Sequence, residues 1–109
     1  MNKAMLIGRI CNDLEKKYIC DSTVVQVSLA VQRRFKNAKN EYYTDFIQCE
    51  LWEHNADFLE KNFSKGDMVA FVGAIRNNNY EKDGVKHYSN KIVVESVYFT
   101  GSTLMKKKQ

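Results

Sequence analysis

Two long stretches of the chain alternate between apolar and polar residues with a period of two. In the first, Val24 to Phe35, valines and a leucine at odd positions alternate with glutamine, serine and alanine at even ones. The second runs from Tyr42 to Trp52. Because successive side chains of a β-strand point to opposite faces, both stretches are predicted to be strands with one buried face. Proline, which interrupts strands, is absent from all 109 residues.

The stretch from Tyr42 to Trp52 has two faces of different chemistry. One face suits a core and carries Ile47, Cys49 and Leu51. The other combines two large aromatic rings with two polar groups: Phe46, Gln48, Glu50 and Trp52. Aromatic rings on a water-exposed strand face can stack unpaired nucleic-acid bases. Packing of Phe46 and Trp52 under a loop or against a second subunit is the alternative, and this strand alone leaves both open.

Four further segments complete the predicted order of elements. Three are strands and one is a helix; in chain order they are Lys3–Ile10, the helix Asn55–Lys65, Met68–Arg76 and Tyr88–Phe99. Asn55 is predicted to cap the start of the helix, and Gly66 to end it in a left-handed conformation. Asp83 and Gly84 predict a tight hairpin turn between the last two strands.

The resulting order is three strands, a helix and two strands. It predicts a mostly β fold, a five-stranded OB-fold barrel with one α-helix between strands three and four, and such barrels bind oligonucleotides or oligosaccharides across strands two and three. Those are the strands with the alternating patterns. Residues 1–101 are expected to form this single domain. Residues 102–109, which include Lys106, Lys107 and Lys108, are expected to be a short basic disordered tail.

Positive charge is concentrated beside the aromatic strand. The chain has a net charge of +4 and a pI near 9.0, which favours polyanionic partners. Four cations fall within seven residues immediately before the strand: Arg33, Arg34, Lys36 and Lys39. Arg76 lies beside another aromatic residue, Tyr80, on the fourth predicted strand and its extension. All five cations are candidates for contacts with phosphate groups.

Several classes of function are not expected. Cys11, Cys20 and Cys49 form no Cys-x-x-Cys pair, and His54 and His87 are far apart in the sequence, so neither a metal site nor a cofactor is predicted. A nuclease would need carboxylates around a metal ion, and Asp57 is explained by the start of a helix. We therefore expect no enzyme. No apolar run approaches the roughly 20 residues that cross a membrane, and we expect a cytoplasmic protein.

Five blocks of the sequence, in the same order, resemble the bacterial single-stranded DNA-binding proteins. The blocks are Met1–Lys3 with Leu6–Arg9, Leu29–Phe35, Asp45–Cys49, Tyr80–Gly84 and Val94–Val97, and the likeness covers residues 1 to about 99. The family forms homotetramers of OB-folds that coat single-stranded DNA in replication, recombination and repair. The resemblance therefore implies a nucleoid-associated protein that stacks bases on four aromatic residues: Phe35, Phe46, Trp52 and Tyr80.

The first predicted strand is apolar on both faces, with Ala4 and Leu6 on one of them. An exposed apolar edge strand invites aggregation unless a partner covers it. We therefore predict that Ala4 and Leu6 contribute to a two-fold interface between subunits. The tetramer implied by the resemblance would then be a dimer of dimers.

The resemblance leaves the cellular role open. Family members commonly continue into a flexible linker and an acidic tip that recruits replication proteins, whereas these 109 residues end in lysines and glutamine, so recruitment through such a tip is not expected. A truncated chain and a short accessory form from a phage, mobile element or competence system both fit. The alternative function is a primosome-type OB-fold accessory protein acting mainly through protein partners. Cold-shock RNA chaperones are shorter and lack the predicted helix.

Overall fold

The structure is a computed structural model that describes residues 1–101. The predicted basic tail, with Lys106, Lys107 and Lys108, lies outside the described residues. Five strands are long: β1 (Ala4–Ile10), β3 (Ser22–Lys36), β4 (Tyr42–Trp52), β5 (Met68–Asn77) and β8 (Asn90–Phe99). Three are short: β2 (Lys17–Ile19), β6 (Tyr80–Lys82) and β7 (Val85–His87). The single helix described is α1 (His54–Asn62).

The five long strands close into a barrel. β1 pairs with β5, β5 with β8 and β3 with β4, all antiparallel, whereas β8 runs parallel to β4. The barrel closes where Arg9 and Ile10 of β1 pair with Ala30 and Leu29 of β3. This arrangement confirms the predicted OB-fold. The helix follows β4 and precedes β5, because β2, which the sequence analysis did not predict, moves the strand count up by one.

Two glycines allow the strands to approach closely enough for this closure. A Cβ atom on Gly8 would lie 2.5 Å from the carbonyl oxygen of Ala30, and one on Gly73 would lie 2.3 Å from that of Val93. Real Cβ atoms do not come this close to backbone atoms. Both positions therefore require glycine.

The core lies inside the barrel and follows the predicted alternation. Val25, Val27 and Leu29 of β3 are fully buried, and Leu51 of β4 joins them. The helix contributes apolar side chains, of which Leu59 is fully buried. Burying a side chain of this size stabilises the fold by about 1.5–3 kcal/mol. The odd-numbered residues of β3 thus fix which face of the hairpin points outward.

Both predicted ends of the helix are wrong. The helix begins at His54, and the side-chain amide of Asn55 donates instead to the carbonyl oxygens of Val94 and Glu95, at 3.3 and 3.2 Å. It ends at Asn62, before Gly66 is reached. Gly66 does adopt a positive φ of 96°, but in the turn that follows the helix. Long-range backbone pairing determines the conformation at Gly66, since its N–H donates to the carbonyl oxygen of Ile10 at 2.8 Å.

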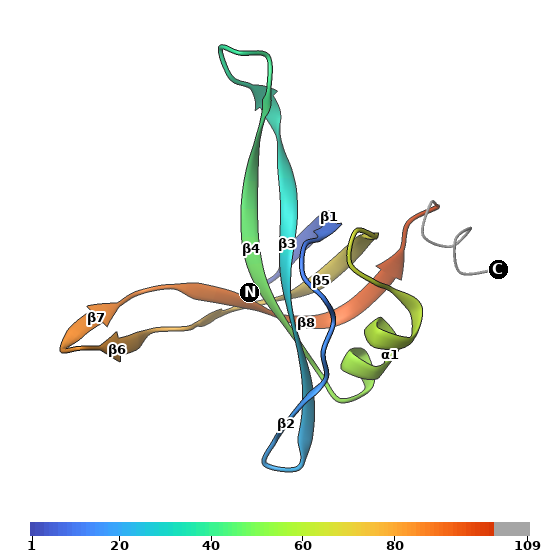
Figure 1. The fold of residues 1–109 in the computed structure, drawn as a ribbon, viewed down its shortest axis with the longest axis vertical. Helices are drawn as coiled ribbons and strands as arrows, with labels where there is room; N and C mark the ends of the chain where they lie inside the picture. The colour runs from blue at the N-terminus through green and yellow to red at the C-terminus, as the bar shows by residue number, and fades with distance from the viewer. Residues whose placement is uncertain (102–109) are drawn as a thin grey trace.

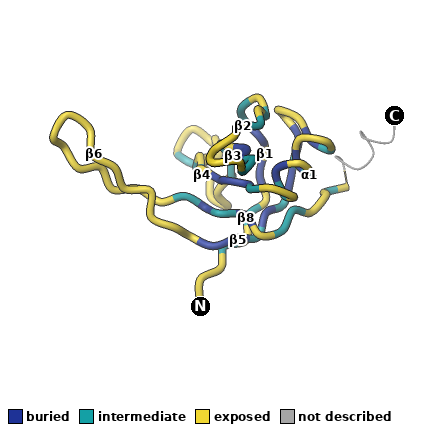
Figure 2. Tube along the Cα trace, turned by 90° about the horizontal axis from the view of Figure 1, so that it is seen from below, coloured by how far each residue is buried: buried dark blue, intermediate teal, exposed yellow. Residues whose placement is uncertain are grey.

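Two hairpins extend well beyond the barrel, in different directions (Figure 1). The first arm is formed by the end of β3 and the start of β4, and the second arm contains β6 and β7. Figure 2 shows the second as a long arm whose residues are exposed along its outer part. At its tip, Asp83 and Gly84 both have positive φ, 53° and 78°, which confirms the predicted hairpin turn. The tertiary structure therefore consists of a compact barrel with two arms.

Candidate nucleic-acid interface

The side of the β3–β4 hairpin that faces away from the core is called the outer face here. It consists of Gln26, Ser28 and Ala30 of β3 and Phe46, Gln48, Glu50 and Trp52 of β4. In the register of the two strands, Ala30 is opposite Phe46, and the other pairs follow at every second residue. The separation of these side chains from Ile47, Cys49 and Leu51 agrees with the strand parity. The outer face joins the barrel to the first arm.

The two aromatic rings of the outer face have different surroundings. Phe46 is 64% exposed, so its ring is available to a ligand. Trp52 is only partly exposed and lies opposite the buried Val24, where β2 also pairs with β3. Its indole N–H donates to Oε1 of Glu50 at 2.8 Å. Phe46 is therefore unrestrained by hydrogen bonding, whereas the edge of the Trp52 ring is fixed.

Each arm carries one of the remaining aromatic candidates. Phe35 lies near the end of β3 and is 72% exposed, with the guanidinium carbon of Arg34 5.9 Å from its ring centroid. Tyr80 begins β6 and is also exposed. Its ring stacks on His87 of β7, with centroids 4.8 Å apart and planes 10° from parallel. A nucleic-acid base could therefore reach only the other face of the Tyr80 ring.

Arg33 differs from the other predicted cations because it is already paired. Its Nε and Nη2 atoms donate to the two carboxylate oxygens of Asp45, at 2.9 and 2.8 Å. Asp45 lies diagonally across the β3–β4 pair, because its direct partner is Val31. The hydrogen bond with Arg33 holds the pKa of the Asp45 carboxyl below its ordinary value and raises the pKa of Arg33. Much of the charge of Arg33 is thus balanced within the protein.

The other four predicted cations are exposed: Arg34, Lys36, Lys39 and Arg76. Among the ion pairs formed by residues 1–101, none joins any of these four to a carboxylate. The ammonium of Lys36 lies 5.1 Å from the ring centroid of Tyr42. Arg76 is opposite Lys91 where β5 pairs with β8. These four side chains can neutralise phosphate groups without first breaking a salt bridge.

Sequence reasoning did not single out several exposed aromatics and one acidic side chain near the predicted ones. Tyr42 and Tyr43 are exposed at the start of β4, beside Lys36 and Arg33, and Tyr88 follows β7. Tyr42 has the same strand parity as Phe46, so the alternation itself could have identified it. Asp45 could not have been found in this way, because its partner is set by the diagonal register of two strands.

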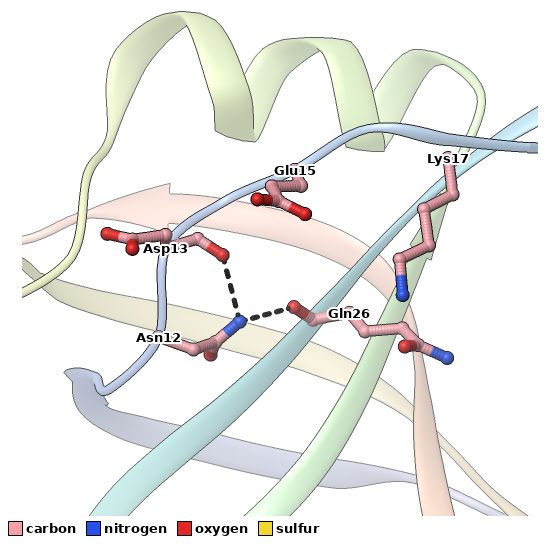
Figure 3. Close-up of a pocket in the computed structure, with 5 residues that line it drawn as sticks. All are labelled: Asn12, Asp13, Glu15, Lys17 and Gln26. Atoms are coloured by element: carbon pink, nitrogen blue, oxygen red, sulfur yellow. Dashed lines mark hydrogen bonds between the residues drawn. The ribbon is translucent and has the colours of Figure 1, made fainter.

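A small polar pocket adjoins the outer face, and hydrogen bonds of one of its lining residues hold neighbouring segments together. It has a volume of about 110 Å³ and is lined by Asn12, Asp13, Glu15, Lys17 and Gln26 (Figure 3). The Asn12 amide donates to the carbonyl oxygens of Asp13 and Gln26, at 3.1 and 2.9 Å, and its oxygen accepts from the Ser28 N–H at 2.7 Å. These bonds attach the segment between β1 and β2 to β3. They explain why this irregular segment lies beside the outer face.

Within residues 1–101, no three or more His, Cys, Asp or Glu side chains are grouped closely enough to hold a metal ion. Over the same part of the chain, no helix has the length and apolar character that a membrane span needs.

Comparison with known proteins identifies relatives over almost the whole chain. Residues 1–100 match the model of the family described as the single-strand binding protein family. The chain is 38% identical over 104 residues to single-stranded DNA-binding protein 3 of Listeria innocua, covering 94% of this chain and 65% of the relative. It is 35% identical over 100 residues to single-stranded DNA-binding protein B of Bacillus subtilis, covering 90% of this chain and 88% of the relative.

Among solved structures, the chain is similar to the small single-stranded DNA-binding protein from Streptomyces coelicolor. The TM-score is 0.75, and the match covers 94% of this chain and 98% of that one. Because the sequences are only 19% identical, this likeness shows the shared fold.

Proposed function

The chain belongs to the single-strand binding protein family, and from this premise we propose that it binds single-stranded DNA without sequence preference, coating and protecting it in replication, recombination and repair. The observation that carries the proposal is the exposure of Phe46 on the outer face, together with the exposure of Phe35 on β3 and Tyr80 on β6. Together with Trp52 these rings offer four stacking positions, each worth about 1–3 kcal/mol per base. No step of this mechanism needs a catalytic group or a cofactor.

Phosphate neutralisation supplies the second part of the affinity. Arg34, Lys36, Lys39 and Arg76 are exposed and form none of the ion pairs among residues 1–101, and each phosphate contact releases counterions. Arg33 has a smaller role than the sequence analysis assigned to it, because Asp45 already balances its charge. Phosphate contacts carry no sequence information, so binding is expected to be similar on all sequences.

Selectivity for single strands follows from stacking. In a duplex the bases are stacked on one another and present no free faces to the rings of Phe35 and Phe46. The test is a titration of fluorescently labelled oligo-dT and of a duplex of equal length and end label, each followed by anisotropy. We expect tight binding of the single strand and much weaker binding of the duplex. Equal affinities at moderate salt would contradict base stacking as the source of selectivity.

Self-association through β1 is part of the proposal. Ala4 and Leu6 pack against the barrel core, whereas Met5 and Ile7, on the opposite side of β1, are 79% and 61% exposed. The β1 strand pairs with β3 only at its last two residues, and the unpaired edge borders a hollow of about 370 Å³. A second copy pairing with this edge would cover both features. We propose a two-fold dimer formed in this way, with tetramers as dimers of dimers.

Because Leu6 packs against the core and Met5 is exposed, Met5 is the better position at which to test the interface. A charge at Leu6 would disturb the core of a single subunit, whereas Met5→Lys alters only the exposed side of β1. Met5→Lys is expected to shift the assembly toward monomers in sedimentation while leaving the unfolding midpoint of the single subunit unchanged. A monomeric unmodified protein at micromolar concentration would overturn the proposed assembly.

A further inference from the structure

An acidic side chain is buried in the middle of the outer face, where an exposed one was expected. Glu50 is only 9% exposed, although its neighbours at the same strand parity, Phe46 and Gln48, are exposed. A buried carboxylate is costly unless both of its oxygens have partners. Both have: Oε1 accepts from the indole N–H of Trp52, and Oε2 accepts from the ammonium of Lys91, each at 2.8 Å.

The network joins β4 to β8. Glu50 and Trp52 lie on β4 two residues apart, so their side chains project from the same face. Lys91 lies on β8, which runs parallel to β4 and pairs with it at Glu50 and Val93. β8 is also the strand to which the second arm returns. Glu50 therefore links the Trp52 ring to the base of that arm.

The positive charge of Lys91 is balanced by the carboxylate of Glu50. Lys91 and Glu50 border a polar hollow of about 120 Å³ on the outer face, together with Gln26, Gln48 and Asn78. The Lys91 side chain, whose ammonium lies 2.8 Å from Oε2 of Glu50, is partly buried. A cation held in this way contributes less to phosphate binding than the exposed Arg76 opposite it. The ion pair with Lys91 instead restrains the side chain of Glu50.

We propose that Glu50 is a positioning residue, which holds the indole of Trp52 in its binding orientation and is itself held by Lys91; the proposal rests on the proposed binding of single-stranded DNA. A ring whose edge is hydrogen-bonded in the free protein has less rotational freedom to lose when a base stacks on it. Phe46, which has no hydrogen-bonding group, lacks such a restraint. Trp52 is therefore the preorganised stacking position of the outer face.

The test compares two neutral replacements of the same residue. Glu50→Gln keeps an oxygen that can accept the indole N–H, whereas Glu50→Leu removes it at similar size. Both remove the carboxylate charge that faces Lys91, so they change the charge of the outer face equally and should have the same salt dependence of binding. Trp52 is the only tryptophan in the chain, so its fluorescence anisotropy in the free protein reports the mobility of this one ring.

We expect the Trp52 ring to be more mobile in Glu50→Leu than in Glu50→Gln, and oligo-dT to bind about two- to tenfold more weakly to the leucine variant. A double-mutant cycle with Trp52→Phe, which lacks the N–H, should abolish this difference when binding is followed with labelled oligo-dT. A general loss of structure would persist in the Trp52→Phe background, so the cycle distinguishes positioning from misfolding.

Equal ring mobility and equal affinity in the two Glu50 variants would overturn the positioning role while leaving the proposed function intact. A difference in affinity that remains in the Trp52→Phe background would overturn it as well. Failure of the unmodified protein to bind oligo-dT would instead remove the proposed function, and with it the role of Glu50 in binding. The anisotropy of the free protein would then show separately whether Glu50 restrains the indole.

Discussion

The two ends of the β3–β4 hairpin have the same secondary structure and opposite environments. At the barrel end, Val27 and Leu29 are fully buried against other strands. At the arm end, beyond Gln32, the side chains of β3 are exposed, and Arg34 and Lys36 lie against aromatic rings of the same hairpin. One pair of strands thus supplies core residues at one end and the exposed candidate binding residues at the other. Substitutions at the two ends should therefore affect different measurements.

Cysteine reactivity should show the largest contrast between buried and exposed parts of the chain. Burial raises the pKa of the Cys49 thiol in the barrel from 9.0 to about 12, which lowers its thiolate fraction near neutral pH about a thousandfold. Cys20 is exposed at the turn between β2 and β3. We expect iodoacetamide to alkylate Cys20 rapidly in the native protein and Cys49 only on unfolding, as measured by peptide mass spectrometry.

The same pKa shift predicts a loss of stability at high pH. Above pH 9 the unfolded state releases the Cys49 proton while the folded state retains it, so the free energy of unfolding should fall as pH rises toward 12. Cys49→Ala should reduce this slope.

Equal alkylation rates of Cys20 and Cys49 in the native state would contradict the burial of β4 in the barrel.

At the barrel end, Leu29→Ala should strongly destabilise the protein. The side chain is fully buried, and its truncation leaves a cavity, so the expected loss is about 2–5 kcal/mol of the free energy of unfolding. Urea denaturation measures this loss. Phe35→Ala, at the arm end of the same strand, is the control and should change stability by less than about 0.5 kcal/mol. Similar losses for the two variants would remove the distinction between the ends.

On the outer face, Phe46→Ala should weaken binding with little effect on folding. Loss of one stacked base should cost about 1–3 kcal/mol of the free energy of binding to oligo-dT. Phe46→Leu is a matched control, because it keeps apolar bulk but removes the π-face. If Phe46→Leu binds as tightly as the unmodified protein, apolar contact and not stacking supplies the affinity.

The smallest expected effects concern the salt bridge at the base of the first arm. Removing one phosphate contact to single-stranded DNA should lower the slope of log K against log salt by about 0.7, and Arg34→Ala should show this change. Arg33→Ala should show less, because Asp45 balances Arg33. Asp45→Asn should release Arg33 and make the slope steeper. Equal reductions for Arg33→Ala and Arg34→Ala would mean that the Arg33–Asp45 pair opens on binding.

Local patterns predicted the long strands, the barrel and the outer face, because period-two alternation is imposed by burial of one side of each strand. They failed where long-range pairing decides the structure. The strand β2 has three exposed residues and no apolar alternation, so only its pairing with β3 reveals it. Gly66 gave a helix-end signal, but its backbone pairs with Ile10.

The candidate site shows the same division. Phe46 and Trp52 followed from strand parity and Tyr80 from its cationic neighbour, whereas Phe35 depended mainly on the resemblance to a family. The partners that modify these roles could not be predicted, because each comes from another strand. Asp45 reaches Arg33 across the hairpin, and Lys91 reaches Glu50 from β8. A sequence pattern predicts on which face of a strand a residue lies. It does not predict which charged residue of another strand will pair with it.

The fluorescence of Trp52 tests the central claim, that bases stack on the outer face, most directly. The signal comes from a single indole, which lies on the same face of β4 as Phe46. Oligo-dT should quench this fluorescence in a saturable way, and a duplex of equal length at the same nucleotide concentration should leave it nearly unchanged. Saturable binding of oligo-dT with no change in Trp52 fluorescence, or equal quenching by the duplex, would contradict the account.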